Sequence, residues 1–273
     1  GDQMAVHVPL TEQAKWEAEN LMASEKNLLK PATGAPVVTP NQDIALGSFY
    51  LTIFDEINKP ADDSDKKEKV RVKHFSSPQD AVFAYKVRQI GLQEKIFVRM
   101  VDSKKFKGDT GARVETTIGR IFFNESFPDK VPYYNEVITK KKLAGIIKFC
   151  LEVYGEEETA KVLDRVKDTG FKYVTKAGYS LGINDFPMLS KKYDILKEGD
   201  IQMEEVEVQF ADGLLTQNER HSKIIEIWAT VKDKVESMNQ GALPKEGPVY
   251  AMIESGARGS WGQLTQVIGM KGL

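Results

Sequence analysis

Two helical patterns separated by a short turn occupy residues 194–238 and constrain the fold of this chain more than any other feature. Asp212-Gly213 interrupts the apolar pattern, and Thr216 and Glu219 then form a capping box, in which each side chain satisfies a free N–H at a helix start. In the second pattern the apolar residues alternate spacings of four and three, as in a coiled-coil seam: Ile224, Trp228, Val231, Val235 and Met238. Two helices of about 20 residues joined by so tight a turn predict an antiparallel helical hairpin.

The predicted hairpin is acidic. From Lys191 to Glu236 the chain has 7 Lys or Arg and 11 Asp or Glu, a net charge of −4. Such a surface binds phosphate poorly and is better suited to a protein partner. The whole chain has 38 Lys or Arg and 40 Asp or Glu, whereas a chain that clamps duplex DNA alone is usually basic.

The 273 residues have the composition of a globular protein, with 41% hydrophobic and 29% charged residues. No run approaches 18 apolar residues, so no membrane partner is expected. The start, Gly1-Asp2-Gln3-Met4, lacks the regions of a signal peptide. The single cysteine, Cys150, excludes an internal disulfide framework and predicts a reducing compartment, hence a cytoplasmic location.

The remainder of the chain predicts a mixture of helices and strands. Helices are predicted at 11–23, from a Ser77-Pro78 start to about Ile90, at 143–154 with a stop at Gly155, and at roughly 157–168. Strands are predicted at 44–46, 49–54, 96–101 and 116–123, with Gly119 at a bulge or a close approach, and polar loops at 55–69 and 103–113. The predicted fold class is therefore α+β, with small β-sheets and helices and a long antiparallel helical hairpin at the end.

General catalytic signatures are absent from the sequence. There is no Walker loop, no GxGxxG after a strand and no HExxH. One cysteine and three distant histidines do not predict a structural zinc site. The lysine clusters at 66–69, 104–107 and 140–142 are more typical of solvated faces than of binding sites.

Three strings of residues carry a family resemblance. They are Gly1-Asp2-Gln3-Met4-Ala5-Val6-His7-Val8-Pro9-Leu10, then 31–36 with 40–47 and 50–52, and finally 251–260 with Gln263 and 269–273. Shorter strings at 116–120, 170–175 and 219–223 lie between them in the same order. Together they resemble the β′ family, the largest catalytic subunits of bacterial RNA polymerases.

The resemblance implies three regions and one activity. Residues 1–24 match the end of the active-site domain, 25–186 the pore domain, and 187–273 the funnel domain with its rim helices. It implies a part in DNA-templated RNA synthesis by nucleotidyl transfer, in a segment that lines the secondary channel through which nucleotides enter. The implied partners are the β, α, ω and σ subunits, the DNA template, the RNA transcript, nucleoside triphosphates and transcript-cleavage factors of the secondary channel.

The resemblance also implies site residues. Asp2 matches the third aspartate of the family's motif Asn-Ala-Asp-Phe-Asp-Gly-Asp-Gln, which binds the catalytic Mg²⁺; the motif's first two aspartates precede Gly1, so the metal site is incomplete. Gln3 and His7 match the active-site wall. Arg258 lies between glycines, where a guanidinium can bind phosphate bidentately, and is the candidate for binding the nucleoside triphosphate; the alternative is an arginine that holds a Gly-rich turn together.

The hairpin supplies the candidate residues for binding a factor: Asp212, Gly213, Glu219, Arg220, Lys223 and Glu226. The alternative for them is a solvated tip with no partner. The alternative for the whole chain is a stand-alone interaction module whose hairpin binds transcription factors. Since Gly1 begins inside a motif, the expectation is a piece of a longer subunit, without polymerase activity when isolated.

Overall fold

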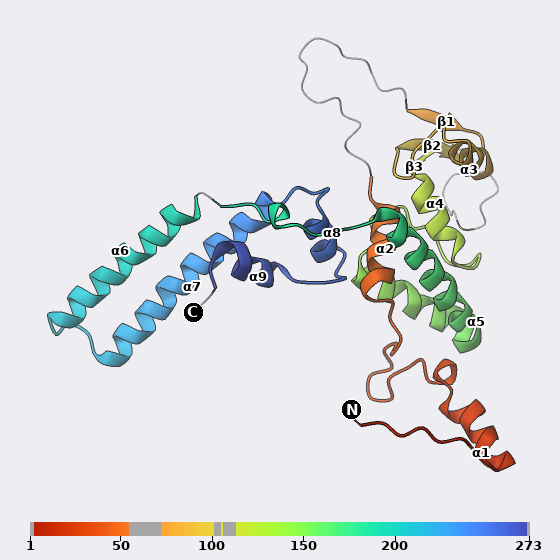
Figure 1. Cartoon of the computed structure of the whole chain (residues 1–273), viewed down its shortest axis with the longest axis horizontal. Coiled ribbons are helices and arrows are strands. Elements are labelled where there is room, and N and C mark those ends of the chain that lie inside the picture. Colours follow the sequence, from red (N-terminus) through yellow and green to blue (C-terminus); the bar gives the residue numbers. More distant parts are fainter. Residues whose placement is uncertain (1–2, 55–71, 101–104, 106–112, 190, 272–273) are drawn as a thin grey trace, which may run out of the picture. The chain divides into compact units, whose positions relative to one another are not determined.

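The computed structural model describes residues 3–54, 72–100, 105, 113–189 and 191–271 (Figure 1). The chain divides into two compact units, Gly1–Ala177 and Gly178–Leu273. Helices, one small sheet and a long hairpin make this an α+β protein, as predicted. No helix within the described ranges combines the length and apolar character that a bilayer-spanning segment needs.

The first unit begins with a short exposed helical region. Helix α1, Glu12–Glu17, continues into a π-helical turn, Ala18–Met22, and is followed by a 3₁₀ turn, Ser24–Lys26. The Thr11 hydroxyl caps α1 by accepting a hydrogen bond from the Ala14 N–H. The helix predicted at 11–23 is therefore confirmed, although none of its residues is buried.

Residues 42–52 form a helix, so the strands predicted at 44–46 and 49–54 are wrong. Helix α2, Gln42–Thr52, begins at Asn41, whose side chain accepts a hydrogen bond from the Gln42 N–H. Seven of its eleven residues are buried, because it packs against the long helix α5, Lys140–Ala177. A helix buried on nearly all sides has no polar face, and its short apolar runs therefore resemble buried strands.

A three-stranded sheet consists of β1, Lys73–Phe75, β2, Ile96–Arg99, and β3, Arg113–Thr116. Strand β2 lies in the centre, parallel to β1 and antiparallel to β3. Helix α3, Pro78–Lys86, lies beside the strands (Figure 1) and begins with the predicted Ser77 cap. It ends four residues before the predicted Ile90, because Arg88 has a positive φ of 60° that a helix cannot include.

The strand predicted at 116–123 is wrong beyond its first residue. Strand β3 ends at Thr116, and the Thr117 hydroxyl caps helix α4, Ile118–Glu125, by accepting from the Arg120 N–H. The predicted close approach at Gly119 is confirmed, since a Cβ there would lie 2.0 Å from the Leu51 carbonyl oxygen. Contacts on two sides bury six of the eight residues of α4, including Arg120 and Asn124, so its polar side faces the interior of the unit instead of solvent.

Gly155 interrupts helix α5, as predicted, with φ of 76°. The second half of the helix continues to Ala177, well beyond the predicted end near 168. Around α5 lies the main core of the first unit, formed by buried apolar residues from five stretches of chain: Leu51, Phe123, Phe127, Val131, Ile138, Leu143, Ile146, Ile147, Cys150, Val162, Val166 and Tyr173.

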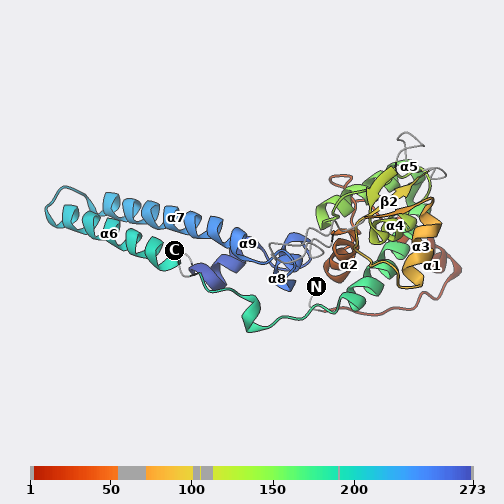
Figure 2. The same ribbon diagram turned by 90° about the horizontal axis from the view of Figure 1, so that it is seen from above.

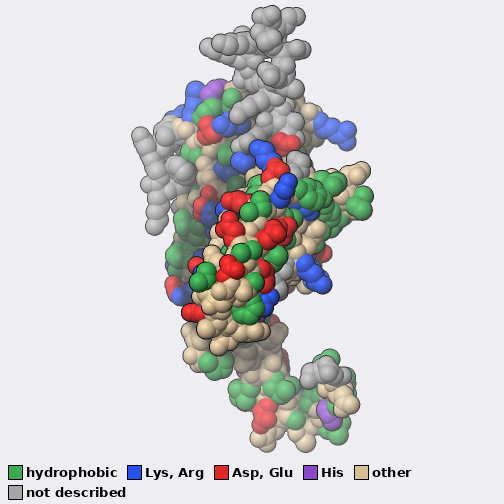
Figure 3. All heavy atoms as spheres, turned by 90° about the vertical axis from the view of Figure 1, so that its left-hand side faces the viewer, with side chains coloured by type: hydrophobic (Ala, Val, Ile, Leu, Met, Phe, Trp, Pro, Cys, Tyr) green, Lys and Arg blue, Asp and Glu red, His purple; other side chains and the backbone are tan. Residues whose placement is uncertain are grey.

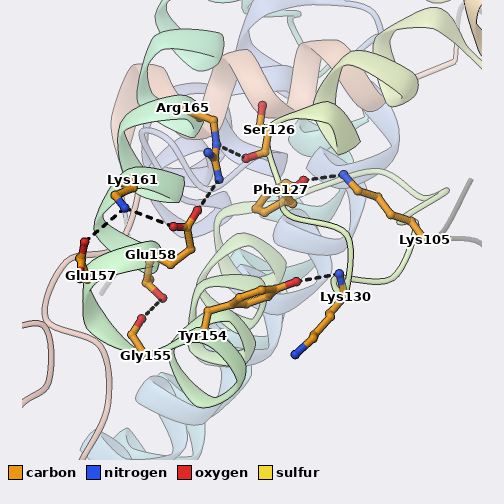
Figure 4. A network of polar contacts seen from close by, with 11 residues as sticks. Lys105, Ser126, Phe127, Lys130, Tyr154, Gly155, Glu157, Glu158, Lys161 and Arg165 are labelled. Atoms are coloured by element: carbon orange, nitrogen blue, oxygen red, sulfur yellow. Dashed lines mark hydrogen bonds and ion pairs between the residues drawn. The ribbon is translucent and has the colours of Figure 1, made fainter.

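Polar contacts fix the chain that leaves α4 to the second half of α5 (Figure 4). Arg165 donates from Nε to the Ser126 carbonyl at 3.0 Å and lies 3.5 Å from a Glu158 carboxylate oxygen. Lys105 Nζ donates to the Asn124 and Phe127 carbonyls. These cations satisfy carbonyls that the end of a helix leaves free.

The second unit contains the predicted hairpin and a small helical base. A 3₁₀ turn, Ile183–Asp185, precedes α6, Lys192–Ala211, and α7, Gln217–Ala242, which lie side by side (Figure 2). The base consists of α8, Pro248–Glu254, α9, Trp261–Leu264, and a π-helical turn, Thr265–Gly269. The hairpin prediction is confirmed; the polar loops predicted at 55–69 and over most of 103–113 lie outside the described residues.

Candidate functional site

The turn between α6 and α7 is closed by backbone hydrogen bonds. The N–H of Asp212 donates to the Val208 carbonyl at 2.9 Å, and the N–H of Leu214 donates to the Gln209 backbone carbonyl at 3.0 Å. Gly213 adopts a φ of 73°, the left-handed conformation that ends many helices. The two candidate residues Asp212 and Gly213 are therefore exposed on a turn whose backbone is held in place.

The predicted capping box at the start of α7 is confirmed. The Glu219 carboxylate accepts from the Thr216 N–H at 2.8 Å, and the Thr216 hydroxyl accepts from the Glu219 N–H at 3.4 Å. Hydrogen bonds from the Thr216 backbone and hydroxyl lower the pKa of Glu219 below its ordinary value. Glu219 is thus already used to hold the helix start.

Arg220 is also used inside the hairpin. It donates from two nitrogens to Glu207 of α6, at 2.9 and 2.7 Å, and its guanidinium lies 4.9 Å from the centre of the Phe210 ring. The neighbouring Lys223 reaches the Gln209 amide oxygen at 3.4 Å. These contacts join the two helices near the turn, so both cations have a structural role there.

Farther from the turn the helices approach closely at Gly199. A Cβ at this position would lie 2.9 Å from Val231 and 3.4 Å from Trp228. Val231 and Val235, two members of the predicted seam, are 4% and 0% exposed. The part of the predicted seam formed by Trp228 and Val231 therefore contacts α6 at Gly199, whereas Met238 packs against the apolar cluster of the base.

The end of the hairpin combines exposed apolar and acidic side chains (Figure 3). Leu214 is 72% exposed in the turn and Val208 is 55% exposed on α6. Asp212 and Glu226 are exposed, and neither side chain makes a hydrogen bond or ion pair with the residues that the structure describes. Val208 is not among the site residues predicted from the sequence, although its position outside the apolar seam indicates an exposed apolar side chain.

Arg258 lies on a glycine-rich turn between α8 and α9. Its N–H donates to the Met252 carbonyl at 3.1 Å, and Gly256 and Gly259 have φ of 74° and 77°. The buried Ser255 hydroxyl accepts from the Ala257 N–H at 3.2 Å. Backbone groups and Ser255 therefore hold this turn, whereas the exposed Arg258 guanidinium contacts no hydrogen-bond acceptor in the described part of the chain.

The remaining candidates lie at the N-terminus. Gln3 and His7 are exposed in an extended segment before α1, and Asp2 is outside the described residues. Across the described ranges no group of three or more His, Cys, Asp or Glu side chains is arranged to hold a metal ion. The described residues therefore do not form a magnesium site by themselves.

Comparison with known proteins identifies the family. The family described as RNA polymerase Rpb1, domain 3, matches residues 27–186. The chain belongs to the Rpb1 family of RNA polymerase subunits. A second Rpb1 family, described as RNA polymerase Rpb1, domain 4, matches residues 214–273, which include α7 and the Arg258 turn.

Relatives of the Rpb1-family chain agree with this assignment. It is 40% identical to the DNA-directed RNA polymerase subunit β′ of Syntrophomonas wolfei, 41% to that of Heliobacterium modesticaldum and 42% to that of Pelotomaculum thermopropionicum. Each alignment covers all of this chain and 23%, 23% and 22% of the relative. The resemblance to the β′ family is confirmed, and the chain spans less than a quarter of the length of these subunits.

Proposed function

We propose that this chain acts as part of the catalytic β′ subunit of a bacterial DNA-directed RNA polymerase, in RNA synthesis by nucleotidyl transfer. The observation that carries the proposal is the alignment of the whole chain with β′ subunits at 40–42% identity. The assembled enzyme would contain the β, α, ω and σ subunits and would use a DNA template, nucleoside triphosphates and the transcript. It would work in the cytoplasm.

The proposal gives each region a role. Residues 25–186 form the pore domain and 187–273 the funnel domain, and together they line the channel through which nucleotides enter. Residues 1–24 end the active-site domain, with Gln3 and His7 in its wall. Asp2 serves as a Mg²⁺ ligand in the intact subunit, together with carboxylates that are not in this sequence.

Arg258 binds the triphosphate of the incoming nucleotide in this proposal. Its support is that the turn is held by Ser255 and by backbone groups, so the guanidinium is available to a ligand. The test is Arg258→Ala in polymerase reassembled with the full-length subunit. Losing a charge-assisted hydrogen bond should raise the KM for nucleotides about tenfold or more, because such bonds contribute about 1.5–3 kcal/mol.

The matched control is Lys245→Ala, which removes an exposed cation from the same unit. We expect it to leave the KM unchanged. An Arg258→Ala enzyme with a wild-type KM and rate would contradict the assignment.

The hairpin end binds a protein that regulates the polymerase in this proposal. Asp212, Gly213, Glu226 and the exposed Leu214 provide the contact surface, whereas Glu219, Arg220 and Lys223 hold it in shape. A partner that fits would have an apolar patch bordered by basic side chains. Transcript-cleavage factors of the Gre type are the candidates.

The test measures the affinity of the purified full chain for a Gre-type factor. Asp212→Lys with Glu226→Lys should weaken binding about tenfold or more, since like charges would face each other. Asp200→Lys with Asp233→Lys makes the same charge change elsewhere on the hairpin and should have little effect. Equal affinities of the two double variants would contradict binding at the hairpin end.

A further inference from the structure

The outer face of the three-stranded sheet carries a group of side chains that the proposed function does not use. The register of the strands places His74, Phe97 and Glu115 in one row, and Arg99 opposite Arg113 in the next. The inner face is different, because Ile96 and Val98 point into a core with α3 and α4 and are 0% exposed. Since side chains alternate along a strand, the two rows lie on the opposite face.

The first row provides an aromatic surface. The rings of His74 and Phe97 are stacked, with their centres 5.0 Å apart and their planes 10° apart. His74 is exposed and Phe97 is half-buried. A planar group can therefore extend this stack from the solvent side, as nucleic-acid bases do on aromatic side chains.

The second row provides positive charge. Like charges directly opposite each other on a sheet destabilise it, so an anion bound between Arg99 and Arg113 would be stabilising. Both guanidinium groups are exposed, and neither forms an ion pair with the residues that the structure describes. The one carboxylate in the two rows, Glu115, is neutralised by Lys95 at 2.6 Å.

The charge of the two units favours the same kind of ligand. Gly1–Ala177 contains 28 Lys or Arg and 26 Asp or Glu, whereas Gly178–Leu273 contains 10 and 14. The sheet thus belongs to the more basic unit. A stacked aromatic pair next to two exposed guanidinium groups matches a chain of alternating bases and phosphates better than it matches an acidic protein surface, which offers few planar groups.

We propose that this sheet face binds single-stranded nucleic acid without sequence preference. A base stacks on the His74–Phe97 pair, and the adjoining phosphates accept hydrogen bonds from Arg99 and Arg113. This site is independent of Arg258 and of the hairpin, so the variants that test the proposed function do not affect it.

The experiment measures binding of the full chain to a fluorescent oligouridylate of about 12 nucleotides, a length within the range of single-strand sites. At physiological salt we expect a Kd of about 1–100 μM, as in non-specific binding, and tighter binding at about 50 mM salt. Phe97→Leu removes the ring and keeps an apolar side chain, and it should weaken binding at least fivefold. Phe97→Tyr keeps the ring and should bind as the wild type does.

The arginines are tested by the salt dependence of binding. Arg99→Gln with Arg113→Gln should reduce the slope of log K against log salt by about 1.4, since each phosphate contact with a single strand contributes about 0.7. Lys141→Ala with Lys148→Ala removes two exposed cations on α5 and should leave the slope unchanged. Circular dichroism establishes that each variant is folded.

An abasic strand of the same length separates stacking from charge. The wild type should bind this strand as weakly as Phe97→Leu binds oligouridylate. Equal wild-type affinities for the abasic and normal strands, an unchanged salt slope in the arginine variant, or no binding by the folded chain would each overturn the proposal. Binding of an acidic protein, instead of the oligonucleotide, to this sheet face would also overturn the proposal.

Discussion

Gly47 of α2 and Gly170 of α5 meet where the two helices cross, and a Cβ at Gly47 would lie 2.0 Å from the Gly170 carbonyl oxygen. A Cβ at Gly170 would in turn lie 2.8 Å from the Cα of Ile44. Both clashes are with backbone atoms, which cannot move aside as a flexible side chain can. The crossing therefore requires a glycine on each helix.

Gly47→Ala and Gly170→Ala should each destabilise the first unit by at least about 1–3 kcal/mol, the usual range for overpacking a core. Urea unfolding of the full chain measures the change. Gly145→Ala is the control, because Gly145 also lies in α5 but has nothing within 4 Å of the added Cβ. There, alanine should stabilise the helix by about 0.5–1 kcal/mol; losses of equal size at Gly145 and Gly170 would show that the crossing is not the cause.

Arg120 should be the most sensitive charged residue of the first unit. It is 3% exposed, donates to the Thr52 carbonyl at 2.9 Å and to the Asn135 carbonyl at 2.7 Å, and lies 3.9 Å from the centre of the Phe54 ring. Arg120→Met removes the donor from three acceptors, the Thr52 and Asn135 carbonyls and the Asn135 side-chain oxygen, and should reduce the free energy of unfolding by about 3 kcal/mol.

Arg120→Lys separates geometry from charge. A single ammonium cannot reproduce the planar fork that reaches both carbonyls, so we expect lysine to restore little of the loss. Lys148→Met, at an exposed position of α5, should change stability by less than about 0.5 kcal/mol. Full stability of Arg120→Lys in urea unfolding would show that only the charge matters.

Elements with local signals could be predicted from the sequence, and elements defined by distant contacts could not. The hairpin was predictable because its signals are local: a capping box, a turn glycine and a helix with an apolar seam on one face and polar residues on the other. Helices α2 and α4 were predicted as strands because their burial depends on distant partners, Gly170 and Leu51, that no local pattern reveals. The ion pair of Arg220 with Glu207 could not be predicted either, because it depends on how α6 and α7 align.

Cys150 predicts a loss of stability at alkaline pH. Burial raises the pKa of its thiol from 9.0 to about 11. The folded state therefore holds a proton that the unfolded state releases above pH 9, so the stabilisation is complete below that pH and declines as the pH rises toward 11. In Cys150→Ala the decline in unfolding free energy between about pH 8 and about pH 10 should be smaller.

The range below pH 10 is chosen because two tyrosines act in the same direction at higher pH. Burial raises the pKa of Tyr133 and of Tyr173 from 10.0 to about 12. A Cys150→Ala chain with the same pH dependence as the wild type below pH 10 would contradict the role of the thiol.

The Thr216–Glu219 capping box predicts the opposite pH dependence at the hairpin end. Hydrogen bonds from Thr216 hold the pKa of Glu219 below its ordinary 4.5, so the stabilisation is present above that value and is lost as the pH falls through the folded-state pKa. The intrinsic exchange rate of an amide falls between pH 7 and pH 3, so the Arg220 amide is measured relative to its intrinsic rate at each pH, and its exchange should show an excess at low pH as the cap is lost. Glu219→Gln, which does not titrate, should remove this excess, whereas Glu226→Gln should retain it because that carboxylate caps no helix. Thr216→Ala should also destabilise the hairpin at pH 7, by about 1 kcal/mol, because a cap oxygen is lost. An excess that survives in Glu219→Gln would show that another group at the hairpin end titrates.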